Sequence, residues 1–177
     1  MRIIGGIHKG KRITAPKNLP VRPTTDFAKE GLCNILSHEF NFEHIAVLDL
    51  FCGTGNISFE MASRGAKSVR SIDQNFGCIS FVKKKASELE LHQIKAFKNS
   101  VKGYLTKFPD KFDLIFADPP YDMKGLDEIV TLIFEKGLLN DGAWFVLEHD
   151  RNWDFTAHEH FLKHKSYGNV HFSIFQN

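Results

Sequence analysis

The sequence predicts an α/β protein built on a doubly wound sheet of seven strands, because short apolar runs alternate with amphipathic stretches along most of the chain. Five apolar runs are expected to form parallel strands, and they lie at residues 45–48, 68–72, 94–97, 112–117 and 143–147. After the second run, apolar residues recur at helical spacing, as at Ile79, Val82 and Ala86. The length of 177 residues, 42% of them hydrophobic, suits one domain with a sizeable core.

The last two strands are expected at residues 161–165 and 170–175, on either side of Gly168 and Asn169. Consecutive strands joined by so short a connection predict an antiparallel hairpin. A hairpin that ends a doubly wound sheet is more typical of a methyltransferase than of a dehydrogenase.

The N-terminal part of the chain is expected to form a small hairpin followed by a helix. Residues 2–4 and 11–14 flank a glycine-rich turn, which favours a short β-hairpin arm. After a proline-rich stretch, Thr24 or Thr25 can cap a helix. The spacing of apolar residues predicts that the buried face of this helix is formed by Phe27, Gly31, Leu32, Ile35 and Leu36.

The arm, which we define as residues 1–23, differs in charge from the body, residues 24–177 of the same domain. The first 25 residues contain no acidic side chain, whereas the remaining sequence carries 17 basic and 21 acidic residues. A basic arm on a mildly acidic body predicts a polyanionic partner such as a nucleic acid, and a solvated flank is the alternative. The residues expected to bind RNA are Arg2, Lys9, Lys11, Arg12 and Arg22.

Several other classes are disfavoured by the composition. No apolar run approaches the roughly 20 residues that span a bilayer, and the first residues lack the apolar region of a signal peptide. The three cysteines match no zinc or redox spacing. His158, His160 and His164 lie in a polar segment without a matched set of ligands, so no metal site is expected. We expect a cytoplasmic protein that does not bind a membrane.

A glycine loop directly follows the first expected strand, in the segment Asp49-Leu50-Phe51-Cys52-Gly53-Thr54-Gly55. A dinucleotide loop would need a third glycine where Ser58 stands. A phosphate loop would need lysine followed by serine or threonine, and neither pair follows Gly55. Asp49 would repel a pyrophosphate but suits the ammonium group of a methionine moiety. These features favour S-adenosylmethionine as the cofactor.

Two further strand ends complete the expected cofactor site. Asp73 ends the second strand, where a carboxylate can accept both hydroxyls of a ribose. Ser100 and Val101 follow the third strand, where the edge of an adenine would lie. The cofactor residues expected along these strand ends are Asp49, Phe51, Cys52, Gly53, Thr54, Gly55, Asp73, Gln74, Ser100 and Val101.

The fourth strand ends in Asp118-Pro119-Pro120-Tyr121, a turn whose two prolines lack N–H donors. An exocyclic amine on a base is a poor nucleophile, because its lone pair is delocalised into the ring. The Asp118 carboxylate and the Pro119 carbonyl can accept its two N–H bonds and localise that pair. Asp118 can also accept the released proton, and Tyr121 offers a face on which an extruded base stacks. The turn therefore predicts methyl transfer to an amino group of a base, with Asp118, Pro119 and Tyr121 as the catalytic residues.

Taken together, these motifs resemble the bacterial 16S ribosomal RNA guanine-N2 methyltransferases of the small, single-domain type. The matching segments, in the same order as in that family, are residues 2–6, 10–12, 22–26, 48–55 and 118–121. The first three are the more diagnostic, because the glycine loop and the Asp-Pro-Pro-Tyr turn recur in many amino-methyltransferases. The resemblance implies a class I methyltransferase fold and a guanine of the small ribosomal subunit as the target.

The resemblance also implies how the N-terminal segments act. The segment at 22–26 would lie over the cofactor site, which adds Thr25 to the expected cofactor residues, and the arm would grip 16S rRNA or a small-subunit particle. A monomer is expected. One departure is Phe27, which stands where that family usually has a basic residue, and Lys29 is the candidate to take its place.

Three other functions remain open at this point. Adenine-N6 methylation of DNA or RNA uses the same Asp-Pro-Pro-Tyr turn, although this chain has no room for a large target-recognition domain. A non-catalytic RNA-binding protein on the same fold is disfavoured by the intact Asp118 and Tyr121. A nucleotide-dependent oxidoreductase is disfavoured by Ser58.

Overall fold

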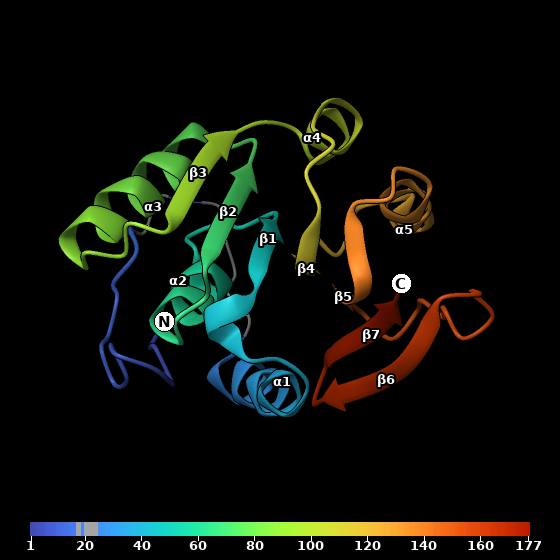
Figure 1. Cartoon of the computed structure of the whole chain (residues 1–177), viewed down its shortest axis with the longest axis horizontal. Coiled ribbons are helices and arrows are strands. Elements are labelled where there is room, and N and C mark those ends of the chain that lie inside the picture. The colour runs from blue at the N-terminus through green and yellow to red at the C-terminus, as the bar shows by residue number, and fades with distance from the viewer. Residues whose placement is uncertain (17–18, 20–24) are drawn as a thin grey trace.

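The computed structural model describes residues 1–16, 19 and 25–177. Within this part of the chain, seven strands form one sheet in the order β3-β2-β1-β4-β5-β7-β6 (Figure 1). The strands are β1 (Ala46–Leu50), β2 (Ser68–Asp73), β3 (Ile94–Lys98), β4 (Phe112–Ala117), β5 (Leu139–His149), β6 (Phe161–Tyr167) and β7 (Val170–Gln176). The helices are α1 (Asp26–Glu39), α2 (Asn56–Ser63), α3 (Phe76–Glu88), α4 (Val101–Lys107) and α5 (Leu126–Glu135), with a short 3₁₀ helix, η1, at Phe42–His44. The predicted doubly wound sheet is confirmed.

The helices cover both faces of the sheet. Helices α1, α2 and α3 pack on one face and α4 and α5 on the other, so the apolar side chains form two cores (Figure 1). Strand β1 pairs in parallel with both β2 and β4, and the chain returns from β3 to β4 across this centre. The crevice beyond the carboxyl ends of β1 and β4 is therefore the topological switch point, where open α/β sheets bind ligands.

The predicted C-terminal hairpin is also confirmed. Strand β7 pairs antiparallel with β5, so that His149 lies opposite His171, and β6 closes the sheet beside β7. The start of β7 therefore lies at the same edge as the end of β5. Strand β5 is longer than expected, because it continues through Gly142, whose φ of +73° accompanies an irregular register with β4.

The buried face of helix α1 coincides only in part with the face that the spacing predicted, because Leu32 and Leu36 are buried as expected but Phe27 is not. Its buried residues are Ala28, Lys29, Leu32, Cys33 and Leu36. Phe27 is 68% exposed and meets the ring of Tyr167 edge-on, so its assignment to the buried face was wrong. Gly31 lies against the same Tyr167, where an added Cβ would come within 2.1 Å of the ring. The close approach of β6 therefore requires glycine at position 31.

The arm forms the expected hairpin. Arg2 and Arg12 make an antiparallel bridge, and backbone hydrogen bonds join Ile3 to Lys11 at 2.9 Å and Ile13 to Met1 at 3.0 Å. The boundary expected at residue 23 lies outside the described residues. Among the helices of the described chain, none combines the length and hydropathy that crossing a bilayer requires.

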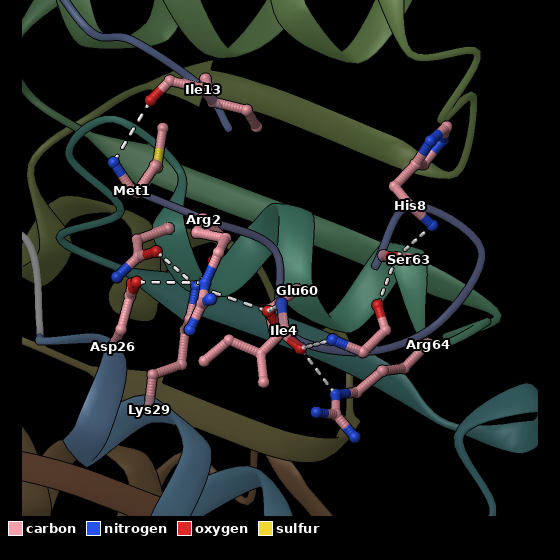
Figure 2. Close-up of polar contacts among 12 residues, drawn as sticks. Met1, Arg2, Ile4, His8, Ile13, Asp26, Lys29, Glu60, Ser63 and Arg64 are labelled. Carbon is pink, nitrogen blue, oxygen red and sulfur yellow. Dashed lines mark hydrogen bonds and ion pairs between the residues drawn. The ribbon is translucent and has the colours of Figure 1, made fainter. Parts of the chain in front are cut away.

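The arm is fastened to helix α2 through Glu60, which is fully buried (Figure 2). The Glu60 carboxylate accepts the backbone N–H groups of Ile4 at 2.8 Å and Gly5 at 2.9 Å. It also lies 2.8 Å from the Arg64 Nε and 3.4 Å from the Lys29 Nζ. We call Glu60, Lys29 and Arg64 the arm anchor.

Candidate functional site

A cavity of about 1170 Å³ opens at the carboxyl ends of β1, β2, β4 and β5. It brings together the glycine loop after β1, the turn after β4 and the start of β7, which are far apart in the sequence. Of the expected cofactor residues, those that line it are Thr25, Asp49, Phe51, Cys52, Gly53, Thr54, Asp73, Gln74 and Val101. The expected catalytic residues Asp118, Pro119 and Tyr121 line the same cavity.

Asp49, in β1, is held by a serine network at the base of the cavity. Its carboxylate accepts the Ser58 backbone N–H at 3.0 Å and also the Ser58 hydroxyl, which is 2.6 Å from the Ser71 hydroxyl. Burial raises the pKa of Asp49 to about 7, against an ordinary value of 3.8. The side chain at position 58 thus does more than exclude a dinucleotide loop, because it fixes the orientation of this acid.

The glycine loop has the left-handed backbone that a close approach to a ligand needs. Phe51, Gly53 and Gly55 have φ angles of +58°, +50° and +79°. Gly55 is absent from the cavity lining, and an added Cβ there would come within 2.9 Å of the Phe59 ring. Gly55 therefore shapes the start of α2, and its role in cofactor binding stays a prediction. Burial raises the pKa of the Cys52 thiol well above its ordinary value, so the thiol stays protonated and is no nucleophile.

Asp73 is anchored by backbone donors at the end of β2. One carboxylate oxygen accepts the Gly53 N–H at 2.9 Å and the other accepts the Asn75 N–H at 2.7 Å. A carboxylate offers about four lone-pair sites, so each oxygen can accept one more donor, such as a ribose hydroxyl. The contact with Gly53 ties this acid to the glycine loop.

Ser100 is not among the residues that line the cavity, and its role in cofactor binding stays a prediction. Its hydroxyl oxygen accepts the Gly103 N–H at 3.1 Å and so caps helix α4. A serine between a strand and a helix is a common N-cap, and this local task explains its position. The neighbouring Val101 does reach the cavity and gives it an apolar wall.

The turn after β4 brings an acid and an aromatic ring to the cavity. The Asp118 N–H lies 3.4 Å from the Leu50 carbonyl of β1, and the Pro120 carbonyl accepts the Met123 N–H at 2.9 Å. Pro119 is buried, whereas Tyr121 is 48% exposed. The Tyr121 hydroxyl donates to the Glu148 carboxylate at 3.4 Å.

Glu148, which our reading of the sequence missed, is only 2% exposed and lines the cavity. Ala117 of β4 is in register with Leu147 of β5, so Asp118 and Glu148 occupy equivalent places on adjacent strands. Glu148 directly follows the apolar run 143–147, just as Asp118 follows 112–117. The signal that singled out Asp118 could therefore have identified Glu148.

The expected RNA-binding residues fall into three groups. Lys9, Lys11 and Arg12 are exposed on the arm. The Arg2 side chain lies 3.5 Å from Asp26, and Arg22 lies outside the described residues. Lys29 does not take the place of a basic residue at position 27: it is 1% exposed, and its Nζ donates to the Arg2 carbonyl at 2.7 Å and to Asn56 at 2.8 Å.

The His-rich tail shows no metal centre within the described residues, where no group of three or more His, Cys, Asp or Glu side chains could hold an ion. His164 instead lies 3.1 Å from His171, nitrogen to nitrogen, across β6 and β7. The pKa of His164 is lowered, mainly by partial burial and then by the charge of His171.

A doubly wound sheet closed by an antiparallel hairpin, with a ligand cavity at its switch point, defines the class I methyltransferase fold. The chain belongs to the family described as Conserved hypothetical protein 95, whose model matches residues 1–176.

Known proteins similar to this chain are named as methyltransferases. YlbH of Bacillus subtilis, described as a candidate rRNA methyltransferase, is 36% identical over 155 residues, which are 85% of this chain and 83% of that protein. Ribosomal RNA small subunit methyltransferase D of Haemophilus influenzae is 28% identical over 183 residues, covering 100% of this chain and 94% of that protein. A solved structure from Escherichia coli, described as the candidate methyltransferase yhhF, has a TM-score of 0.88 at 27% identity and covers 100% of this chain and 97% of its own.

Proposed function

We propose that this protein transfers a methyl group from S-adenosylmethionine to the exocyclic N2 of a guanine in 16S rRNA. The observation that carries the proposal is that one cavity joins Asp49 of β1 to the Asp118–Tyr121 turn. The similarity to ribosomal RNA small subunit methyltransferase D along the whole chain supports the choice of substrate. The enzyme would act as a cytoplasmic monomer.

The residues around the cavity fit the proposed cofactor. The buried Asp49 carboxylate would receive the ammonium group, Asp73 would accept ribose hydroxyls, and Val101 would pack against the adenine. When bound, S-adenosylmethionine supplies an electrophilic methyl group on a cationic sulfur. Thr25 also lines the cavity and would contribute to the cofactor site.

The chain's own groups prepare the target amine. The Asp118 carboxylate and the Pro119 carbonyl would accept its two N–H bonds and localise the lone pair on N2. Asp118 would take up the proton that N2 loses as its new bond to carbon forms. The half-exposed ring of Tyr121 would stack on the base, typically worth about 1–3 kcal/mol, and hold N2 in place.

The arm would hold the rest of the RNA. Lys9, Lys11 and Arg12 are exposed on the arm, whose backbone is fixed to α2 through Glu60. A docked arm presents its charges at fixed positions, so less conformational entropy is lost when it meets a phosphate backbone. We therefore assign RNA binding to residues 1–23 and methyl transfer to residues 24–177.

The proposal is tested by identifying the methylated nucleoside. The protein would be incubated with radiolabelled S-adenosylmethionine and small-subunit RNA or particles, and the RNA then digested to nucleosides. Labelled N2-methylguanosine is expected, whereas N6-methyladenosine would replace the proposal with the adenine alternative. No labelled nucleoside at all would favour a non-catalytic RNA-binding protein.

A variant of Asp118 tests the mechanism. Asp118→Ala should lower the rate of transfer by about 10²–10⁴-fold, because the acceptor of both an N–H bond and the released proton is lost. Cofactor affinity, measured by calorimetry, should stay within a few fold of the unmodified protein. If cofactor affinity falls as much as the rate, Asp118 belongs to the cofactor site and the mechanism is wrong.

A further inference from the structure

Glu148 is a buried acid on the wall of the cavity that the proposed mechanism does not use. It lies in β5 beside the end of β4, so it faces the same space as Asp118 from the adjacent strand. Its carboxylate also accepts the Tyr121 hydroxyl at 3.4 Å, which connects it to the ring on which the base would stack. The cavity therefore has two carboxylates on adjacent strands, Asp118 and Glu148, where a base edge would lie.

Guanine and adenine differ in the group next to the amine that would be methylated. Guanine carries an N1–H donor beside its N2 amine, whereas adenine carries a bare N1 acceptor beside its N6 amine. An ionised carboxylate is an acceptor only, so it binds the N1–H of guanine and repels the N1 lone pair of adenine. A site built to hydrogen-bond one donor rejects the analogue that lacks it far more strongly than an apolar pocket does.

We infer that Glu148 selects guanine by accepting the N1–H of the target base, while Asp118 and Pro119 accept the N–H groups of N2. The inference rests on the proposed function and names the residue that distinguishes guanine from adenine within it. A carboxylate has about four lone-pair sites, so Glu148 can accept the Tyr121 hydroxyl and N1–H together. Three acceptors then face the three N–H bonds along one edge of guanine.

The test compares two bases that share the amine but differ at N1. Small-subunit RNA would be ligated to carry either guanine or 2-aminopurine at the position that the wild-type enzyme methylates. It would be presented free or as a particle, as that enzyme requires. 2-Aminopurine keeps the amine at C2 and has an acceptor at N1. The wild-type enzyme should prefer guanine by about 100-fold or more in kcat/KM.

Glu148→Gln should collapse that preference. Its amide can donate to the N1 acceptor of 2-aminopurine, so the ratio of kcat/KM values should fall to within about tenfold. 2-Aminopurine also lacks the oxygen at C6, but any contact with that oxygen is lost equally for both enzymes. A change in the ratio therefore reports on the contact between residue 148 and this edge of the base.

Three control variants separate base selection from other effects. Asp141→Asn removes an exposed acid from the other end of β5 and should leave the ratio unchanged. Tyr121→Phe removes the hydroxyl that contacts Glu148 and should keep the preference for guanine even if the rate falls. Glu148→Asp keeps the carboxylate and should retain the preference at a lower rate, which tests the inference if the glutamine variant does not fold.

An unchanged ratio in a folded Glu148→Gln variant that binds the cofactor normally would overturn the inference and leave the proposed function intact. A ratio that collapses as fully in Tyr121→Phe would also overturn it, because Glu148 would then act only by holding Tyr121. A wild-type enzyme that forms no N2-methylguanosine would instead reject the proposed function itself, together with this inference.

Discussion

The arm anchor and the base of the cavity both bury carboxylates, but they surround them differently. Glu60 meets two cations, Lys29 and Arg64, within 3.4 Å, and all its contacts join parts of the chain to one another. Asp49 is hydrogen-bonded by the neutral N–H and hydroxyl of Ser58, and its pKa is raised to about 7 by burial, with a small further rise from the charge of Asp73. A carboxylate neutralised by internal cations stabilises the fold, whereas one supported by neutral donors is suited to a cationic ligand.

The difference between the two regions is tested most strongly by removing the charge of Glu60, from which the largest effect is expected. Glu60→Gln should lower the free energy of unfolding by about 3–5 kcal/mol, because the buried Lys29 ammonium loses its counter-charge. The new amide group would also face backbone donors of Ile4 and Gly5 that need acceptors. Urea denaturation followed by circular dichroism would measure the change.

A matched control is Glu128→Gln, which breaks an ion pair with Lys102 on the surface. Its side chain is 60% exposed, so the expected loss is below about 1 kcal/mol. If the two variants unfolded at the same urea concentration, the arm anchor would be no more important than a surface pair, and the distinction between the two regions would fail.

A smaller effect is expected from the pH dependence at Asp49. Because its pKa is about 7 in the free protein, an ammonium ligand must bind the ionised form and displace a proton. Affinity for S-adenosylhomocysteine, which keeps the ammonium group, should therefore rise between pH 6 and about 8. Asp49→Asn should lower affinity by about 10–100-fold and flatten this rise. Calorimetry in two buffers of different ionisation enthalpy would count the released proton.

The raised pKa of Asp49 also makes the stability of the ligand-free protein depend on pH. Stability falls as pH rises, whereas ligand affinity rises. The folded-state pKa of about 7 exceeds the ordinary value of 3.8. The contribution of Asp49 to the free energy of unfolding is therefore fully present below pH 3.8 and is lost as pH rises through about 7. In Asp49→Asn, the free energy of unfolding should no longer fall in this way between pH 3.8 and about 7. If binding and stability of the variant followed the wild-type pH profiles, Asp49 would not be the titrating group.

The sequence allowed the sheet to be predicted because strand–helix alternation and acids at strand ends are local signals. It located only part of the buried face of α1, because the partners of Lys29 come from residues 2, 56 and 60 rather than from its own helix. Helical spacing alone therefore placed Phe27 inside. Ser100 shows a related ambiguity, because a serine after a strand can serve either a ligand or a helix cap, and here it caps α4.

The site itself was predicted in part. The residues of the glycine loop and the turn after β4 share one cavity, as expected from strands whose carboxyl ends meet at one edge. The contribution of β7 depends on its antiparallel pairing with β5, which places Phe172 opposite Glu148 and which no short motif encodes. Long-range register thus decides which part of the C-terminal hairpin reaches the cavity.

The smallest effect is expected from removing the exposed charges of the arm. Replacing Lys9, Lys11 and Arg12 with alanine should weaken RNA binding by about tenfold at moderate salt and reduce the slope of log K against log salt by about two to three. These side chains are exposed while the arm backbone is held by Glu60, so the variant should keep its fold and its cofactor affinity. Filter binding of small-subunit RNA over a range of salt concentrations would give the slope.

The control for the arm is a triple variant of Lys83, Lys84 and Lys136 to alanine, which removes the same charge from helix α3 and the end of α5. A similar loss of slope in both variants would mean that RNA responds to net charge and not to the arm. A loss of slope confined to the arm variant would show that the charges of the arm bind RNA. One buried carboxylate would then hold the backbone of the arm in place while the side chains of the arm contact a partner outside the fold.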